Sequence, residues 1–346
     1  MKKRYIVIVA LIVLLITGYF VLGRIFLPPA GDFDENPIEV KIKPGLSSNA
    51  IANILKDKGI IKNADDFHFA CRLFRCIDRL KAGRYQILPG QSVYQVMKII
   101  VEGKTSHIPV VIPEGFTSFE IASLLQKKLE IDSAKFIEKT INPTLLKDRG
   151  IDAPSAEGYL FPNTYYFYWG ISEAEVIKLM VNHFFENFND SLQLIVQEEG
   201  WTIHQIVTIA SLIEGEAMID SERVIISAIY YNRLKKGMLL QACPTVQYLI
   251  PGHPRRLLNR DLAIDSPYNT YIYPGLPPGP VNNPGMQSIY AAINPADVDY
   301  LYLVARGDGS HIFSTSLSQH LKAKAKFDEL RRTIKRNQRL NGSKKR

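Results

Sequence analysis

The sequence is poor in the residues from which metal sites and disulfide frameworks are built. It has three cysteines and seven histidines in 346 residues, too few and too unevenly spaced for either kind of site. Cys71 and Cys76 lie five positions apart in a helical pattern, so we expect their side chains to point about 140° away from each other and to bridge poorly. We interpret both, and Cys243, as small core residues. We expect no metal and no cofactor.

Motifs of several large enzyme classes are also missing. There is no Gly-x-Ser-x-Gly elbow, no Ser-x-x-Lys, no His-Glu-x-x-His, no Walker loop and no dinucleotide fingerprint. These absences disfavour metal, nucleotide and serine-nucleophile mechanisms. His311 lies on a predicted strand among apolar neighbours, which favours a structural role over a catalytic one; a place lining a site is the alternative.

Positive charge is confined to one end of the chain. The net charge is +8, but Lys322 to Arg346 carry eleven basic side chains against two acidic ones, which leaves the rest of the chain near −1. A basic surface for nucleic acid is therefore not indicated. Residues 336–346 are expected to form a basic disordered tail, most simply a solvated end, with contacts to anionic lipid or wall polymers as the alternative.

The N-terminus carries the localisation signal. Basic residues within positions 1–4 precede an uncharged apolar run from Tyr5 to Gly23, long enough to cross the roughly 30 Å hydrocarbon core as a helix. We predict a cytoplasmic tail at residues 1–4 and a transmembrane helix at residues 5–26, with everything after Pro28 outside the cytoplasmic membrane. A cleaved signal peptide is the alternative, but the run is long for one and no A-x-A-like site follows it.

A weak internal repeat organises the first half of the chain. Short β-like runs at Ile38–Ile42, Gly83–Ile87 and Ile108–Ile112 are each followed by a turn containing Pro and Gly and by an apolar helical run. After the membrane helix, the sequence predicts an α+β fold class: a small module at residues 38–105 and a mixed α/β catalytic domain at residues 106–335. The module resembles the LysM modules that hold wall glycans; a plain α+β spacer is the alternative.

An almost wholly apolar stretch near the middle of the chain ends in two carboxylates. Thr202 and Gln205 form a capping-box start, and apolar residues recur at helical spacing as far as Ala217. Glu214 and Glu216 lie two positions apart, about 200° around such a helix, so they cannot share one substrate bond as an acid and base pair. At most one of them faces a site.

Glu216 is the better candidate for a catalytic acid. It falls on the stripe of Ile209, Leu212 and Ile213, and Gly215 beside it is expected to leave room for a ligand. A carboxyl group held among apolar neighbours tends to stay protonated near neutral pH, as a general acid must. The alternative is that both glutamates are solvated at an ordinary helix end.

Aromatic and turn-forming residues crowd the second half of the chain. Ser266 to Gly285 is rich enough in proline and glycine to predict a loop of fixed shape, and a hairpin pattern follows at Tyr300–Ala305 and His311–Thr315. A protonated carboxyl among Tyr, Asn and Gln side chains is typical of a carbohydrate site. Outside the cytoplasmic membrane, the most abundant polymer of alternating sugars is peptidoglycan.

Six ordered motifs, in a match that runs over nearly the whole chain, resemble those of the MltG (YceG-like) endolytic murein transglycosylase family. They are Ile209-Ala210-Ser211-Leu212-Ile213-Glu214-Gly215-Glu216-Ala217, Ser221-Glu222-Arg223, Tyr231-Asn232-Arg233-Leu234, Tyr268-Asn269-Thr270-Tyr271, Gly275-Leu276-Pro277-Pro278-Gly279 and Asn283-Pro284-Gly285. The resemblance implies that Glu216 is catalytic and that glycan strands are cut internally. It also implies a single-pass anchor in the bacterial inner membrane, a catalytic domain on the periplasmic side and peptidoglycan synthases as partners.

The implied reaction explains why one carboxylate suffices. Glu216 protonates the oxygen between N-acetylmuramic acid (MurNAc) and N-acetylglucosamine (GlcNAc), then accepts a proton from the C6 hydroxyl of MurNAc as that group attacks C1. A 1,6-anhydro end results without water. The residues predicted to line the substrate, with folding of the Pro-rich loop as their alternative role, are Gln241, Thr245, Tyr268, Asn269 and Tyr271.

The chain departs from the family pattern at a further motif. Where the family commonly has Gln-x-Asp-Pro-Thr, this chain has Gln241-Ala242-Cys243-Pro244-Thr245, so Cys243 replaces an aspartate that positions or hydrogen-bonds other groups. Glu157 and Glu222 are expected to hold structure by pairing with Arg223 or Arg233.

Two other functions stay open from the sequence. A muramidase that hydrolyses the same bond needs a second carboxylate near Glu216, with Glu157 or Asp265 as candidates. A membrane-tethered wall-binding scaffold needs no catalytic acid, and its Glu216 is structural.

Overall fold

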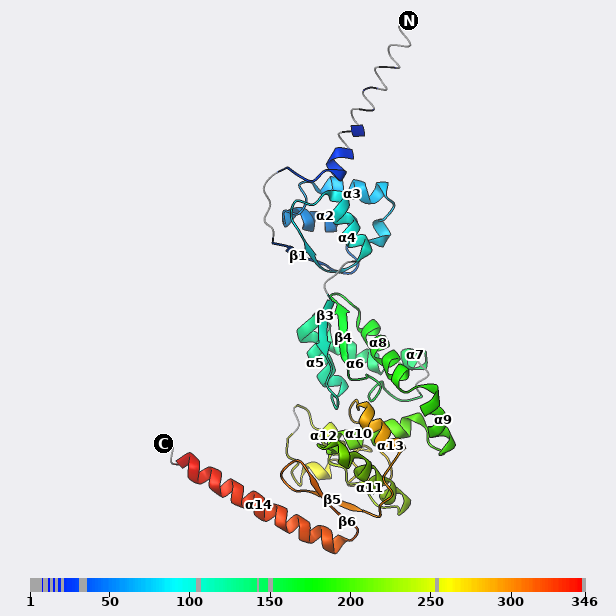
Figure 1. The fold of residues 1–346 in the computed structure, drawn as a ribbon, viewed down its shortest axis with the longest axis vertical. Coiled ribbons are helices and arrows are strands. Elements are labelled where there is room, and N and C mark those ends of the chain that lie inside the picture. Colours follow the sequence, from blue (N-terminus) through cyan, green and yellow to red (C-terminus); the bar gives the residue numbers. More distant parts are fainter. Residues whose placement is uncertain are drawn as a thin grey trace. The chain divides into compact units, whose positions relative to one another are not determined.

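The chain folds into two compact units. The computed structural model describes residues 8, 12, 15, 18–19, 22–30, 36–103, 107–141, 143–148, 152–252 and 255–343 (Figure 1). Unit 1 consists of Met1–Val110, Leu125–Ile131 and Tyr165–Ser172, and unit 2 consists of Val111–Leu124, Asp132–Thr164 and Glu173–Arg346. The first segment of unit 1 ends close to the boundary expected at residue 105, and two short later segments join that unit.

Unit 1 is built around a two-stranded antiparallel sheet. Strand β1 (Ile38–Ile42) pairs with β2 (Gly83–Ile87), with Ile38 opposite Ile87. Between the strands lie α2 (Ser48–Asp57), α3 (Ala64–Leu73) and the 3-10 helix η1 (Ile77–Arg79), and α4 (Val93–Glu102) follows β2. Val40 and Tyr85 on the strands are fully buried in one core with the apolar faces of the helices. The likeness of this module to LysM modules stays a prediction.

The predicted repeat of strand, glycine turn and capped helix is confirmed in three copies. The turn glycines Gly45, Gly90 and Gly115 have φ values of 79°, 80° and 76°, which side-chain-bearing residues rarely adopt. Each following helix begins behind a hydroxyl that accepts a backbone N–H, on Ser47, Ser92 or Thr117. In the third copy, β3 (His107–Val111) pairs with β4 (Thr164–Tyr168) and precedes α5 (Ser118–Leu129).

Unit 2 is mainly helical and carries the predicted β-hairpin. The hairpin pairs β5 (Tyr302–Ala305) with β6 (His311–Ser314). The helices and 3-10 turns that follow α5 are α6 (Ser133–Thr140), α7 (Pro143–Lys147), α8 (Glu173–Asn187), α9 (Asp190–Glu198), α10 (Ile203–Glu216), η2 (Asp220–Glu222), α11 (Arg223–Lys235), α12 (Cys243–Tyr248), η3 (Asp261–Ala263), α13 (Met286–Ile293) and α14 (Leu317–Ser343).

Helix α10 is buried along most of its length. All residues from Ile206 to Ile213 are buried, because α9, α11, α12 and α13 pack around the helix. This burial explains why the segment is apolar on every side rather than amphipathic. The predicted capping box is confirmed, with Thr202 and Gln205 each accepting the other's backbone N–H. The helix ends at Glu216.

The structure can be compared with the predictions for the two ends of the chain only in part. The predicted tail at residues 1–4 and most of the predicted membrane helix at residues 5–26 lie outside the described residues. Within the described part of the chain, no helix is both long and apolar enough to cross a bilayer. At the other end, α14 continues to Ser343, so residues 336–343 are helical where a disordered tail is expected. Residues 344–346 are outside the described part.

The cysteines differ from the sequence prediction in two respects. Cys71 and Cys76 are buried, as predicted, but Cys243 is exposed, so its assignment to the core is wrong. Helix α3 ends at Leu73, and Cys76 lies beyond it in a turn. The expected divergence of Cys71 and Cys76, which assumes one continuous helix, is therefore also wrong.

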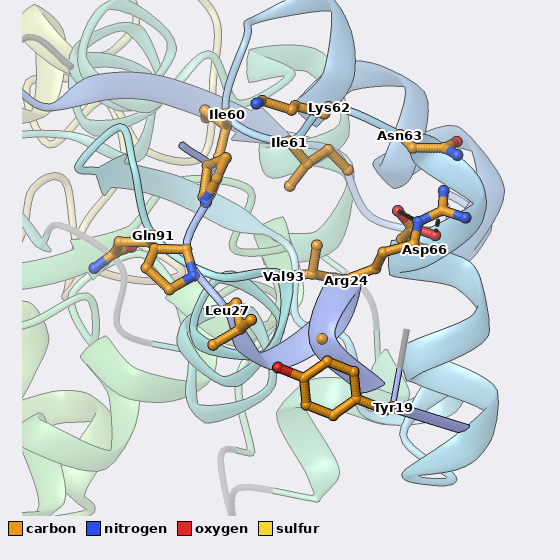
Figure 2. A pocket seen from close by; sticks show the side chains of 13 residues that line it. Tyr19, Arg24, Leu27, Ile60, Ile61, Lys62, Asn63, Asp66, Gln91 and Val93 are labelled. Atoms are coloured by element: carbon orange, nitrogen blue, oxygen red, sulfur yellow. Dashed lines mark hydrogen bonds and ion pairs between the residues drawn. The ribbon is translucent and has the colours of Figure 1, made fainter. Parts of the chain in front are cut away.

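A cavity of about 490 Å³ lies in unit 1, where the end of the N-terminal helix meets the module (Figure 2). Its walls are largely apolar and include Leu27, Ile61 and Val93. Among its described lining residues, the carboxylate of Asp66 is paired with Arg24 at 2.9 Å.

Candidate active site

The two glutamates at the end of α10 have different surroundings. Glu214 is paired with Arg223 at 3.2 Å and accepts hydrogen bonds from the Gly285 N–H at 3.1 Å and the Ser288 hydroxyl at 2.8 Å. The Glu214 and Arg223 side chains are only 7% and 9% exposed. This buried ion pair at the N-terminus of α13 ties α10, α11 and α13 together, which is a structural role.

Glu216 has no such partners. Among the described residues its carboxyl group makes no hydrogen bond and no ion pair. Burial raises the pKa of Glu216, and the positive charges of His311 and Arg233 oppose part of that rise. The net effect is a carboxyl that keeps its proton to a higher pH than an ordinary glutamate, as the sequence predicts for a general acid.

Gly215, between the two glutamates, serves helix packing. A β-carbon at this position would lie 2.6 Å from Cγ of Pro244 and 3.3 Å from Nδ2 of Asn282. Pro244 occupies the space on the side of a β-carbon, while the rest of Gly215 is exposed to solvent, so the predicted room for a ligand stays a prediction. The close approach brings the start of α12, with Cys243, against the end of α10.

His311 is fixed by an acid that is 89 positions away in the chain. Its Nδ1 lies 2.7 Å from Oε2 of Glu222, and its backbone N–H donates to Oε1 of the same carboxylate at 2.9 Å. The structural role expected for Glu222 is confirmed, but the partner is His311 rather than Arg223 or Arg233. Because the charge of His311 lowers the pKa of Glu216, this histidine also belongs to the candidate site.

Arg233 and Tyr230, about one turn apart on α11, complete the surroundings of Glu216. The Arg233 guanidinium donates to the carbonyl of Leu301 at 2.6 Å and lies over the ring of Tyr302, 5.2 Å from its centroid. The buried Tyr230 hydroxyl has no hydrogen-bond partner among the described residues. Burial, and after it the charge of Glu216, raise the pKa of Tyr230. Tyr230 is not among the site residues predicted from the sequence; the signal that could have found it is its i,i+3 spacing from Arg233.

Two of the predicted lining residues lie in the same cluster. The charges of Glu216 and Arg233 act on Tyr271, whose hydroxyl is 3.2 Å from Sγ of Cys243. Gln241 accepts a hydrogen bond from Nη1 of Arg233 at 3.3 Å. Gln241, Tyr271 and the exposed Cys243 thus form one polar wall beside the acid.

The other three predicted lining residues are placed differently. Thr245, in α12, and Asn269, in the Pro-rich loop, are fully buried. The Thr245 hydroxyl meets the hydroxyl of Thr270, and the Asn269 amide donates to the carbonyls of Leu262 and Ile264. The alternative role of folding the Pro-rich loop accounts for these contacts, and substrate contact by either residue stays a prediction. Tyr268 packs against Tyr248, with ring centroids 5.3 Å apart, and the charge that acts on it is that of Glu157.

The two acids named as hydrolase candidates are engaged in other contacts. Glu157 accepts hydrogen bonds at the start of α5, and Asp265 accepts one of 2.6 Å from a tyrosine hydroxyl. Within the described residues, the charges that shift the pKa of Glu216 belong to His311 and Arg233, and no carboxylate is among them.

Glu157 is expected to make the stability of unit 2 depend on pH. Its carboxylate accepts the Ser118 N–H at 3.1 Å and the Asn283 amide at 2.8 Å, yet burial outweighs these bonds and raises its pKa from 4.5 to about 7. The folded pKa exceeds the unfolded one, so this stabilisation is complete below about pH 4.5 and is lost as the pH rises through about 7. The free energy of unfolding should fall by about 3 kcal/mol across this range.

Denaturant unfolding between about pH 4.5 and pH 8 tests this expectation. Glu157→Gln should flatten the pH dependence. Glu120→Gln, a change in the capping box of the same helix, is the matched control; it removes only the smallest cause of the raised Glu157 pKa and should leave most of the pH dependence in place. An equally steep dependence in the Glu157 variant contradicts the assignment.

One half-buried acid, two basic side chains that act on it, and a wall of phenol, amide and thiol groups define a site for general acid chemistry on a polar, hydroxyl-rich substrate. Comparisons with known proteins narrow this class. A model of the YceG-like family matches residues 40–326, and the chain belongs to this family.

Individual relatives span most of the chain. The endolytic murein transglycosylase of Bacillus subtilis (strain 168) is 33% identical over 333 residues, which are 91% of this chain and 91% of that protein. The protein of the same name from Streptococcus pneumoniae (strain ATCC BAA-255 / R6) is 30% identical over 78% of this chain and 54% of its own length. The crystal structure of a yceG-like protein from Listeria monocytogenes, 34% identical, has a TM-score of 0.59 and covers 84% of this chain and 99% of that one.

Proposed function

We propose that this chain is an endolytic murein transglycosylase. It cleaves the MurNAc–GlcNAc bond within nascent glycan strands, leaves 1,6-anhydroMurNAc ends and so limits strand length. The main support is the half-buried carboxyl of Glu216 at the end of α10, whose pKa desolvation raises and beside which Tyr271, Cys243 and Arg233 lie. The names of the curated relatives support the same activity.

The proposed reaction needs one carboxyl group in two protonation states. Glu216 donates its proton to the glycosidic oxygen, the bond from that oxygen to C1 of MurNAc breaks, and GlcNAc leaves with a free hydroxyl. The Glu216 carboxylate then accepts the proton of the MurNAc C6 hydroxyl as its oxygen bonds to C1. The acid is regenerated and no water is consumed, because the nucleophile is part of the substrate.

The groups around Glu216 suit this exchange of protons. Burial alone would hold the proton too tightly for efficient transfer, and the positive charges of His311 and Arg233 stabilise the carboxylate formed after the first step. Tyr230 brings a buried hydroxyl with no partner among the described residues. Tyr271 brings a second phenol that can bind a sugar hydroxyl.

His311→Asn should shift the pH dependence of cleavage. The positive charge of His311 lowers the pKa of Glu216, so its removal raises that pKa. The alkaline limb of the pH–rate profile, where the acid loses its proton, then moves to higher pH. A histidine that only holds the hairpin would lower the rate at every pH without moving this limb. His204→Asn, near the other end of α10, is the control and should leave the limb in place.

The membrane anchor and the partners belong to the same proposal. Residues 5–26 hold the chain in the bacterial inner membrane, residues 1–4 are cytoplasmic, and the LysM-like module and catalytic domain face the periplasm beside peptidoglycan synthases. The support is the apolar run from Tyr5 to Gly23 behind three basic residues. Protease added to spheroplasts should degrade a C-terminal tag on the chain; a protected tag contradicts this orientation.

Product analysis tests the activity itself. Purified glycan strands are incubated with the full chain in detergent, and the new ends are identified by mass spectrometry. Anhydro ends from internal cuts are expected. Reducing ends would assign the muramidase function, and intact strands in the presence of the folded chain would favour the wall-binding scaffold.

A further inference from the structure

The end of helix α3 brings two cysteines together. The Cys76 N–H donates to the carbonyl of Cys71 at 2.9 Å, and the Arg75 N–H donates to the carbonyl of Arg72 at 3.1 Å. Arg75 has a φ of 50°, in the left-handed region. These bonds define a Schellman motif, in which the residue after the left-handed one folds back over the last helical turn. In that motif the residues at the positions of Cys71 and Cys76 contact each other.

Both thiols lie inside the core of unit 1. Cys71 is 0% and Cys76 is 2% exposed. Burial raises the pKa of the Cys71 thiol, and the neighbouring Cys76 side chain adds to the rise. Side chains that the motif brings into contact need only a small movement to reach the sulfur–sulfur distance of a disulfide, roughly 2 Å.

We propose that Cys71 and Cys76 form a disulfide that closes the end of α3. In thiol–disulfide exchange, the two thiols lose two protons and two electrons in total, a disulfide oxidant accepts them, and that oxidant is released as two thiols. The thiols are sealed in the folded unit, so exchange takes place as the unit folds or when the helix end opens locally. Oxidants of this class act outside the cytoplasm, but the pairing itself does not depend on the proposed function.

The disulfide stabilises the contact between the module and the N-terminal segment. Phe74, within the closed turn, packs against Phe26 at a ring-centroid distance of 6.0 Å and against Tyr94 at 5.2 Å. Phe26 belongs to the last turn of the N-terminal helix and Tyr94 to the first turn of α4. The turn therefore joins three segments of unit 1, and a covalent link across it restricts the unfolded chain.

A thiol count with mass analysis tests the proposal. The full chain in detergent is incubated at length in a redox buffer of reduced and oxidised glutathione, then denatured, alkylated and weighed. The expected product carries one alkyl group, on Cys243, and its peptide map shows Cys71 linked to Cys76. Three alkylated cysteines, or glutathione attached to either buried cysteine, would overturn the proposal.

Two cysteine variants identify the paired thiols by the number of alkyl groups that each variant carries. After the same treatment, Cys243→Ser should carry no alkyl group, whereas Cys71→Ser should carry two. The oxidised chain should also unfold at a Tm roughly 5 °C or more above that of the reduced chain. Cys71→Ser should show no such difference; an equal shift in that variant contradicts the pairing. Activity is not a readout, so failure here leaves the proposed function untouched.

Discussion

Glu216→Gln is expected to lower the rate of glycan cleavage by about 10²- to 10⁴-fold, the usual contribution of general acid–base catalysis. Glutamine has nearly the shape of glutamate but cannot donate an acidic proton. Because the Glu216 carboxyl makes no hydrogen bond or ion pair within the described residues, the exchange breaks no structural contact there. The Tm of the variant should therefore stay within a few degrees of the Tm of the unchanged chain. Any rise should be slight, because a group that can become charged is no longer held away from water.

The neighbouring glutamate provides the matched control. Glu214→Gln changes the same chemical group two residues away but weakens a buried ion pair with Arg223. It should lower stability more than Glu216→Gln does. Release of anhydro products per folded molecule and the unfolding midpoint, measured on both variants, separate the two roles. Full cleavage by the Glu216 variant, with loss of cleavage in a stably folded Glu214 variant, would reverse the assignment of the acid.

Arg223→Met is expected to lower the free energy of unfolding of unit 2 by about 3 to 5 kcal/mol. The substitution leaves the Glu214 carboxylate, 7% exposed, without its cation. The hydrogen bonds from Gly285 and Ser288 remain but cannot supply the lost charge. Typical domains are stable by only about 5–15 kcal/mol, so the variant should unfold at much lower denaturant concentration.

Asp220→Asn is the control for this expectation. Asp220 is the second acid paired with Arg223, at 3.0 Å, but its side chain is 79% exposed. Exposed pairs contribute about 0 to 1 kcal/mol, so this variant should unfold almost like the original chain. Equal small effects of both substitutions would contradict a structural role for the buried Glu214–Arg223 pair.

Local signals account for what the sequence predicts correctly. The capping box of Thr202 and Gln205 and the apolar run behind it define α10, because both act within a few residues. The turns at Gly45 and Gly90 follow in the same way from glycine's access to positive φ. The placement of Glu216 at the end of this helix is therefore readable without a structure, whereas the polar groups around it come from distant segments.

Contacts between distant segments could not be predicted in this way. The Glu222–His311 pair joins residues 89 apart, and nothing in either local pattern specifies the other partner. The packing of Pro244 against Gly215 likewise depends on how α12 meets α10. At Cys76 the helix end was missed because a left-handed arginine, Arg75, stands where glycine usually marks the turn.

The residues of the predicted substrate-lining motifs also divide into those that the sequence places correctly and those that only the fold places. Gln241 and Tyr271 belong to motifs that the sequence marks, and both lie beside the acid. Thr245 and Asn269 belong to the same motifs, but their burial is set by how α12 and the Pro-rich loop close on each other. A motif thus identifies a conformationally fixed region, and only the fold separates its exposed residues from its buried ones.

We propose that one carboxyl, Glu216, cleaves glycan strands with a nucleophile from the substrate itself. Cleavage of purified strands in ¹⁸O-labelled water, followed by mass spectrometry of the new MurNAc ends, distinguishes this reaction from hydrolysis. The new ends should be one water lighter than reducing ends and free of ¹⁸O. Reducing ends that carry ¹⁸O would contradict the proposal, because water would then be the nucleophile and a second base would have to activate it.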